Sequence, residues 1–167
     1  GNTNQDVTQL LALLNSVGYS LLRKREWQAL SKLNLFQTNY LTTTGTVTNG
    51  SAVVTAIPTT ATLTTSYQAV GNGILQNSFI SSVDSATQVT LNQQANASGT
   101  AVSITFSQTK YSMPADYDRQ IDNTHWDKTQ HWQMLGPETA QQWEWLTSGY
   151  ISSGPRVRYR IFGDYFQ

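Results

Sequence analysis

The chain contains no cysteine, which excludes disulfide bonds and thiolate metal sites in it. Its 167 residues carry ten basic and ten acidic side chains. This lack of a basic surplus argues against a free-standing nucleic-acid-binding protein. No apolar run approaches the length of a transmembrane helix, so we expect no membrane span. The chain begins with Gly1 rather than methionine, which indicates a processed or truncated chain.

Sequence motifs of catalysis are also missing. No Gly-x-Ser-x-Gly nucleophile elbow occurs. Gly71-Asn-Gly73 begins like a dinucleotide fingerprint, but Gln76 follows and no helix is expected there, so we interpret it as a turn. Glu138 and Glu144, near two tryptophans, are the one carboxylate pair suited to a glycosidase, and solvated helix acids are the favoured interpretation. We therefore predict that the protein is not an enzyme and has no cofactor.

Two groups of residues could bind a metal, but neither has a suitable spacing. Four aspartates fall within twelve residues: Asp116, Asp118, Asp122 and Asp127. They lack the glycine and terminal glutamate of a calcium loop, and roles in caps, turns and ion pairs explain them better. His125 and His131 alternate with tryptophans and have no cysteine partner for zinc, so we favour packing in an aromatic cluster. We predict no metal site.

Charge divides the chain into three blocks. Residues 1–41 carry four basic and two acidic side chains, and residues 110–167 carry six basic and seven acidic ones. Residues 42–109 carry a single charge, Asp84, and are dominated by small polar and β-branched residues. We therefore predict that 42–109 is an inserted β domain, and that 1–41 and 110–167 form one discontinuous core.

The first block begins with a predicted amphipathic helix. Asp6 is its expected N-cap, with Thr3 and Asn4 as alternatives. The apolar positions follow a helical repeat: Val7, Leu10, Leu11, Leu14, Val17 and Leu21. Gly18 within this helix indicates close packing against a neighbouring helix. Beyond the helix, alternating residues predict a strand over 32–38.

The middle block is predicted to be all-β. Asn49-Gly50 is a strong hairpin turn between short β-rich segments over 45–48 and 51–55. Four further candidate strands follow: Tyr67–Val70, Ile74–Val83, Gln88–Leu91 and Ala101–Phe106. Six short strands with little else predict a small sandwich or barrel.

The last block is predicted to mix short strands and a helix. Its first expected elements are an extended segment over 110–113, a helical turn over 115–119 and a hairpin of 121–128 with 131–135. Thr139-Ala-Gln-Gln142 fits a capping box that opens a short helix, with Gly149 as its C′ residue. Residues 156–162 alternate as a strand, and Gly163-Asp164 forms a tight turn after it. The fold class expected is α+β: an N-terminal helix and a short C-terminal helix with β-hairpins, plus an inserted all-β sandwich or barrel domain.

Arginines, two aspartates and tryptophans of the last block are the candidate site residues. Arg156, Arg158 and Arg160 alternate along the predicted strand and form a cationic stripe about 13 Å long on one of its faces. Contact with DNA phosphates, contact with acids of a partner subunit and a solvated strand face remain alternatives. The candidate interface residues are Arg156, Arg158, Arg160, Arg119, Asp116 and Asp118.

Four of the five tryptophans are close together in the sequence: Trp126, Trp132, Trp143 and Trp145. We predict that they form a structural aromatic cluster that fills a core. The alternative is a role as interface anchors, because tryptophan and arginine are common anchors of protein interfaces.

Several segments of the two flanking blocks form a recognisable set. They are Leu-Leu-Ala-Leu-Leu-Asn at 10–15 with Trp-Gln-Ala-Leu at 27–30, Pro-Ala-Asp-Tyr-Asp-Arg at 114–119, Asp122–Thr129, Leu-Gly-Pro at 135–137 with Gln-Gln-Trp at 141–143, and Arg-Tyr-Arg-Ile-Phe-Gly-Asp at 158–164. As a set they resemble the head-to-tail adaptor (connector) proteins of tailed bacteriophages, mostly of the short-tailed type. The chain departs from the family pattern in the Asn and Asp order at 122–123, in Lys128 for arginine, and in the long insertion at 42–109.

This resemblance implies a structural virion protein at the head-tail junction. Such proteins bind beneath the portal protein, form a ring of usually twelve copies, and present a platform for tail proteins such as the nozzle or the tail fibres. Genomic DNA passes through the lumen without specific binding, and the family implies neither catalysis nor a cofactor. The alternative is a carbohydrate- or envelope-binding β module of a phage or surface protein, with the middle block as the binding part.

Overall fold

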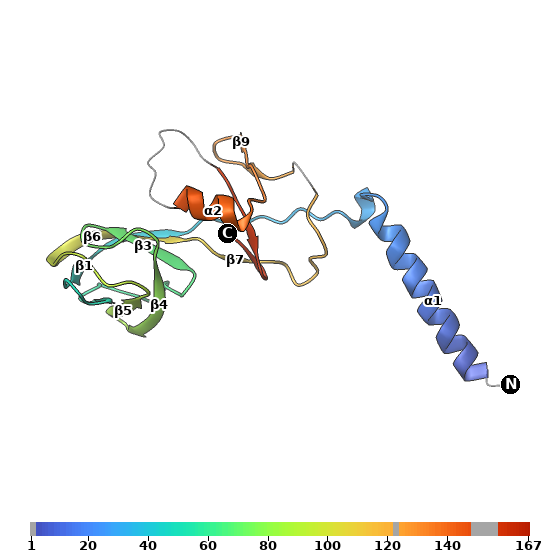
Figure 1. Ribbon diagram of the computed structural model, residues 1–167, viewed down its shortest axis with the longest axis horizontal. Coiled ribbons are helices and arrows are strands. Elements are labelled where there is room, and N and C mark those ends of the chain that lie inside the picture. Colours follow the sequence, from blue (N-terminus) through green and yellow to red (C-terminus); the bar gives the residue numbers. More distant parts are fainter. Residues whose placement is uncertain (1–2, 122–123, 148–156) are drawn as a thin grey trace. The chain divides into compact units, whose positions relative to one another are not determined.

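A computed structural model describes residues 3–121, 124–147 and 157–167 of the chain (Figure 1). The chain divides into two units, Gly1–Leu35 and Phe36–Gln167. Each unit is described by itself below.

The first unit contains one long helix. Helix α1 runs over Thr3–Arg23 and is followed by a short 3₁₀ helix, η1, over Gln28–Leu30. The predicted helix is confirmed, but Asp6 lies inside its first turn rather than at the N-cap, where its carboxylate still suits the positive end of the helix dipole. The predicted strand over 32–38 is wrong. Residues 31–39 form no strand, because alternation over a few residues cannot make a strand without a partner, and Leu33 is 74% exposed.

Six antiparallel strands of the second unit form a nearly closed, barrel-like sheet. They are β1 (Tyr40–Val47), β2 (Val53–Val54), β3 (Tyr67–Gly71), β4 (Ser78–Ser85), β5 (Gln88–Leu91) and β6 (Gly99–Gln108). The strand order is β1-β6-β3-β4-β5-β2. The two end strands meet at a bridge in which Thr46 N donates to Thr55 O at 2.7 Å and Thr55 N donates to Thr46 O at 3.0 Å. This bridge joins the two edges that an open sheet would leave unpaired, at one pair of residues.

The interior of the barrel is apolar and follows the two-residue repeat of the strands. Ile104 and Phe106 of β6 are fully buried, and β5 contributes Val89 and Leu91. The rest of the buried core is Val47, Val54, Ile57, Leu63, Tyr67, Ala69, Ile80 and Ala95. The predicted β-rich character of the middle block is thus confirmed, and the threonines and serines alternate with this core along the strands.

Turns of the barrel agree with the sequence in part. At the predicted Asn49-Gly50 turn, Gly50 has φ +78°, and Ser51 N donates to Thr48 O at 2.9 Å. The strand predicted from residue 74 instead begins at Ser78, because Ile74 N closes a turn on Gly71 O at 3.2 Å, residues 76–77 form a second turn and Asn77 has φ +60°.

Outside the barrel, the described residues of the second unit form short strands and one helix. Strands β10 (Ile161–Phe162), β11 (Tyr165–Phe166) and β7 (Tyr111–Ser112) form a three-stranded sheet in that order, and β8 (Trp126–Asp127) pairs with β9 (Trp132–Gln133). Helix α2 runs over Ala140–Thr147. The helical turn predicted over 115–119 is wrong, since this segment contains only a turn closed by Tyr117 N donating to Pro114 O at 3.0 Å. Among the described residues, two α-helices with mostly antiparallel sheets give the predicted α+β class.

Candidate functional site

Helix α1 carries a face of large apolar side chains that are not buried. We call its six members the apolar stripe: Val7, Leu10, Leu11, Leu14, Val17 and Leu21. Each is between 55% and 69% exposed, and the helix has no buried residue. Residues 3–35 contain no second element that covers the stripe, since only η1 follows α1 there. An amphipathic helix gains most of its stability by burying such a face, so the stripe requires a covering surface.

Gly18 lies beside the apolar stripe on the same helix. A Cβ atom added to Gly18 would meet no heavy atom within 4 Å. The neighbouring helix that the sequence predicted for this glycine is therefore not found in contact with it among the described residues. Gly18 leaves a notch in the surface of the helix.

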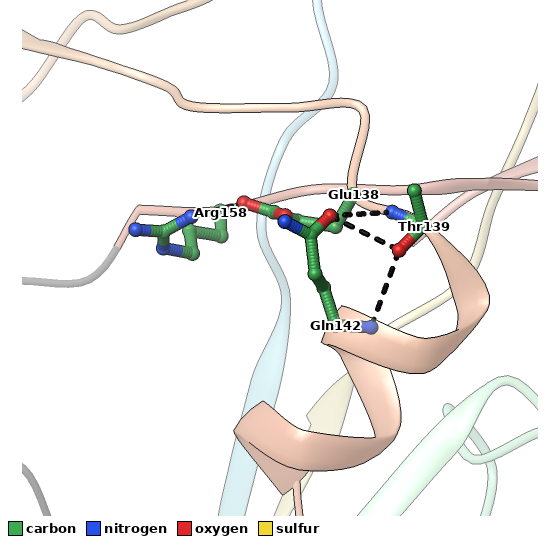
Figure 2. Close-up of polar contacts among 4 residues, drawn as sticks. All are labelled: Glu138, Thr139, Gln142 and Arg158. Atoms are coloured by element: carbon green, nitrogen blue, oxygen red, sulfur yellow. Dashed lines mark hydrogen bonds and ion pairs between the residues drawn. The ribbon is translucent and has the colours of Figure 1, made fainter.

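The predicted arginine stripe is arranged differently from the sequence expectation. Figure 2 shows the Arg158 side chain directed toward the carboxylate of Glu138, whose Oε1 accepts from Arg158 Nη1. The Glu138 side chain is 7% exposed and that of Arg158 is 38% exposed. The backbone brings them together, because Leu135 N donates to Val157 O at 2.9 Å and Tyr159 N donates to Leu135 O at 3.1 Å. Regular strand structure begins only at Ile161, so the strand predicted over 156–162 is shorter than expected.

The capping box beside Glu138 holds the start of α2 in place. Gln142 N donates to Thr139 Oγ1 at 3.3 Å, and Thr139 N donates to Gln142 Oε1 at 3.2 Å (Figure 2). Both bonds of the predicted motif are therefore formed. Because Glu138 directly precedes this cap, the helix start fixes the position of the carboxylate that accepts from Arg158.

Arg160 is also engaged within the chain. Its guanidinium lies over the rings of Trp143, at 4.8 Å, and Phe162, at 4.9 Å. Its Nε and Nη2 donate to Gln167 Oε1 at 3.0 and 2.8 Å. Burial lowers the pKa of Arg160, while the nearby Glu144 carboxylate acts in the opposite direction. Arg158 and Arg160 thus each have partners in their own chain, which the alternation of residues could not reveal.

The other candidate interface residues are less informative. Arg156 lies outside the described residues, as does Gly149. Asp116, Asp118 and Arg119 are exposed and lie in the irregular segment after β7. Their role at an interface stays a prediction.

The aromatic core of the C-terminal region does not consist of the four tryptophans. Trp126, Trp132 and Trp145 are 56%, 42% and 58% exposed, and Trp143 is half-buried beneath Arg160. The prediction that they fill a core is therefore wrong for these three. Their two-residue strands and the short helix α2 are too small to cover rings of this size.

Smaller aromatic side chains form that core instead. Tyr159 and Phe166 stack with ring centroids 4.9 Å apart, and His125 lies 4.5 Å from Tyr159. Phe36 stacks on Phe166 at 5.2 Å and meets the edge of Tyr111 at 5.7 Å. Tyr159 and Phe166 are 2% and 8% exposed. This arrangement confirms the predicted packing of His125 in an aromatic cluster, whereas His131 is exposed.

One shallow cavity lies where the barrel meets the C-terminal sheet. It has a volume of about 340 Å³ and is lined by Thr65, Ser66, Phe79, Ile80, Asn92, Lys110 and Tyr165. The Lys110 ammonium lies 5.8 Å from the centre of the Phe79 ring. Asn92 is fixed by two bonds to Phe79, whose N donates to Asn92 Oδ1 at 2.8 Å and whose O accepts from Asn92 N at 2.9 Å.

Neither a metal-ligand group nor a membrane-spanning helix is found in the part of the chain that the structure describes. No three His, Asp or Glu side chains gather there in a way that could hold a metal ion. None of its helices is both long and apolar enough to cross a bilayer. Comparison with family models, with curated proteins and with solved structures finds no match for this chain.

Proposed function

We propose that the protein is a structural virion protein, a head-to-tail adaptor that forms a ring between the portal and the tail. The exposed apolar stripe of α1 is the observation that carries this proposal. A fully buried valine or leucine contributes about 1.5–3 kcal/mol relative to an exposed one. Six such side chains left more than half exposed on one helix therefore give a strong drive to associate with another protein surface.

The partners follow from the adaptor resemblance of the flanking blocks. The protein binds the portal protein on one side and a tail protein, the nozzle or a fibre, on the other. Copies of the chain contact one another around the ring. Its place is the head-tail junction of the virion, and it carries out no reaction.

Genomic DNA passes through this ring without being gripped. The internal engagement of two arginines favours this, because Arg158 pairs with Glu138 and Arg160 packs over Trp143. A guanidinium already held in this way has less freedom to make bidentate phosphate contacts. The balanced formal charge of the chain points in the same direction.

The β block over 42–109 is an inserted domain in this proposal, and 1–41 with 110–167 form the adaptor core. The two connections to the barrel lie side by side, since Gln108 N donates to Asn39 O at 2.8 Å and Asn39 Nδ2 donates to Gln108 Oε1 at 3.0 Å. Just outside them, the rings of Phe36 and Tyr111 are in contact. A chain that leaves and returns at one point, with flanking residues packed together, is the arrangement expected of an insertion.

The proposal is tested by negative-stain electron microscopy of the purified protein, alone and mixed with a portal protein from the same phage. Rings, or crowns on the portal, are the expected result. Monomers that bind neither one another nor a portal or tail protein would refute the adaptor function.

A second candidate function, recognition of carbohydrate by the β block, is favoured by the cavity beside Phe79. Its lining combines aromatic rings, hydroxyl groups, the Asn92 amide and the Lys110 ammonium. Such groups stack on sugar rings and bond to sugar hydroxyls, and 340 Å³ is within the usual range of ligand sites. Glycan-array binding that is abolished by Phe79→Ala, in a protein that stays monomeric, would favour this function over the adaptor.

A further inference from the structure

The apolar surface of α1 is wider than a two-helix contact needs. Beyond the apolar stripe, Leu13 and Leu22 are 63% and 44% exposed. They are nine residues apart, which places them about 180° apart around the helix at 100° per residue. Apolar residues occupy most of the half of the circumference between them, and the exceptions are Gly18 and the first-turn residues Thr3, Asn4 and Asp6. A seam between two helices uses a narrower row that repeats every seven residues.

The apolar half of α1 has two unlike sides. A central row repeats every seven residues and consists of Val7, Leu14 and Leu21. On one side of it lie Leu10, Leu13 and Val17, which we call the Leu13 flank. On the other side lie Leu11, Gly18 and Leu22, which we call the Leu11 flank. The Leu13 flank has bulky apolar side chains with Asp6 beside them in the first turn, whereas the Leu11 flank contains the open notch at Gly18.

Bulky side chains on one flank and a notch on the other are complementary surfaces. When such surfaces lie on opposite sides of one element, the contact they form is heterologous, with a different patch used on each subunit. Heterologous contacts continue from copy to copy and close into a ring when the rotation permits, whereas a single self-complementary face ends at a dimer.

We infer that each α1 packs between the α1 helices of two neighbouring copies, with its Leu13 flank against the Gly18 notch of one neighbour. The occupant of the apolar surface is thus a second copy of this chain. The helix favours this occupant over a charged partner surface, because it carries only Asp6 and Arg23 among its 21 residues. This inference rests on the proposed ring and specifies the seam of that ring.

The test uses the full chain and two variants that each damage one flank. Leu13→Glu leaves the Leu11 flank intact, and Leu11→Glu leaves the Leu13 flank intact. Both leucines are exposed and glutamate is a good helix former, so the helix is expected to persist in each variant. Ser16→Glu is the matched control, because it adds the same charge on the polar half, about 180° from Val7.

Native mass spectrometry of the proteins, alone and mixed, gives the readout. Wild type and Ser16→Glu are expected to form the same oligomer. Leu13→Glu alone and Leu11→Glu alone are expected to be monomers. An equimolar mixture of these two variants is expected to give one-to-one heterodimers, since a single intact seam remains between them.

Three results would overturn the inference. They are single variants that assemble like wild type, single variants that each form homodimers, and a mixture that stays monomeric. In each of these cases a wild-type ring would leave the adaptor function standing. A wild-type chain that neither self-associates nor binds a portal protein would refute both the adaptor function and this packing of α1.

Gly18→Leu provides an independent check on the notch. Open space surrounds Gly18, so the variant is expected to keep or increase its helix content by circular dichroism. Its oligomer is expected to be lost at concentrations at which wild type assembles. Unchanged assembly of Gly18→Leu would contradict the proposed packing.

Discussion

Glu138 and Arg158, twenty residues apart in the sequence, form an ion pair that joins the start of α2 to the segment before β10. The Glu138 side chain is almost fully buried, so loss of its partner would leave a carboxylate with poor solvation. We expect Arg158→Ala to lower the free energy of unfolding by about 1.5–3 kcal/mol, the usual contribution of a hydrogen bond to a charged group.

Chemical denaturation of single and double variants checks this prediction. In the double variant Glu138→Gln with Arg158→Ala, much of the loss should be absent, because no buried charge is left unpaired. Strictly additive effects of the two changes would show that the ion pair contributes nothing. Because Arg158 pairs with Glu138 in its own chain, reversing its charge would disturb the fold as well as any interface.

Gly136 of the Leu-Gly-Pro segment approaches Tyr159 so closely that no side chain fits between them. Its φ is +150°, and an added Cβ would overlap the backbone oxygen of Tyr159. We expect Gly136→Ala to destabilise the C-terminal region by an amount on the order of 1–3 kcal/mol. Gly163→Ala is the comparison, since open space surrounds Gly163 and only its φ of +57° is unfavourable. A melting temperature for Gly136→Ala no lower than that for Gly163→Ala would contradict the account.

Asp84 gives the barrel a pH-dependent contribution to stability. Hydroxyl groups of Ser82 and Thr90 donate to its carboxylate at 2.6 Å each, and they lower its pKa below the usual 3.8. A lowered pKa in the folded state gives stability that is present above the unfolded-state pKa and is lost as the pH falls through the folded-state pKa.

Thermal melts of wild type and Asp84→Asn across a range of pH check this contribution. Wild type should melt at the higher temperature near neutral pH, and the difference should shrink below pH 3.8. An NMR titration should show the Asp84 carboxyl ionising below that value. A carboxyl that titrates above it, or a difference that grows on acidification, would rule the mechanism out.

Removal of the β block tests whether it is a separable insertion. In the full chain Asn39 and Gln108 are hydrogen-bonded neighbours, so the two ends of the β block lie close together and a short Gly/Ser loop can replace 42–109. We expect the shortened protein to melt cooperatively and to keep its aromatic near-ultraviolet circular dichroism. Loss of both would show that the block is integral to the core.

Removal of the β block would also remove one hydrogen bond to helix α2, and we expect this to lower the stability of α2 by a limited amount. Asn77 Nδ2, on the turn before β4, donates to Thr147 O at the end of α2 at 2.7 Å. Asn77→Gly in the full chain is the matched control, because glycine tolerates the φ of +60° at this position while removing the donor. Amide hydrogen exchange in α2 is the measurement. The protein without 42–109 and the Asn77→Gly variant should lose similar amounts of protection in α2.

Local signals in the sequence predicted local structure well. The strand Gln88–Leu91 and the capping box of Thr139 and Gln142 were each predicted at the right residues. Both depend on interactions between residues a few positions apart, and those are visible in a single sequence.

Contacts between distant segments could not be predicted in the same way. The pairing of Arg158 with Glu138 and the stacking of Tyr159 with Phe166 and Phe36 depend on which segments the fold brings together. Tryptophan content misled the prediction of the core, because the size of a side chain does not tell whether enough neighbouring structure exists to cover it. A signal for the true core was present in the alternation of Val157, Tyr159 and Ile161, which put Tyr159 on the buried face.

The central claim is that the apolar face of α1 drives assembly. It is tested most directly by electron microscopy of Leu14→Glu beside wild type and Ser16→Glu. Leu14 lies in the central row of the apolar half and is 69% exposed, so the change should leave the second unit folded, as judged by an unchanged melt. The account predicts rings for wild type and Ser16→Glu and none for Leu14→Glu. Rings of normal size formed by Leu14→Glu would contradict it.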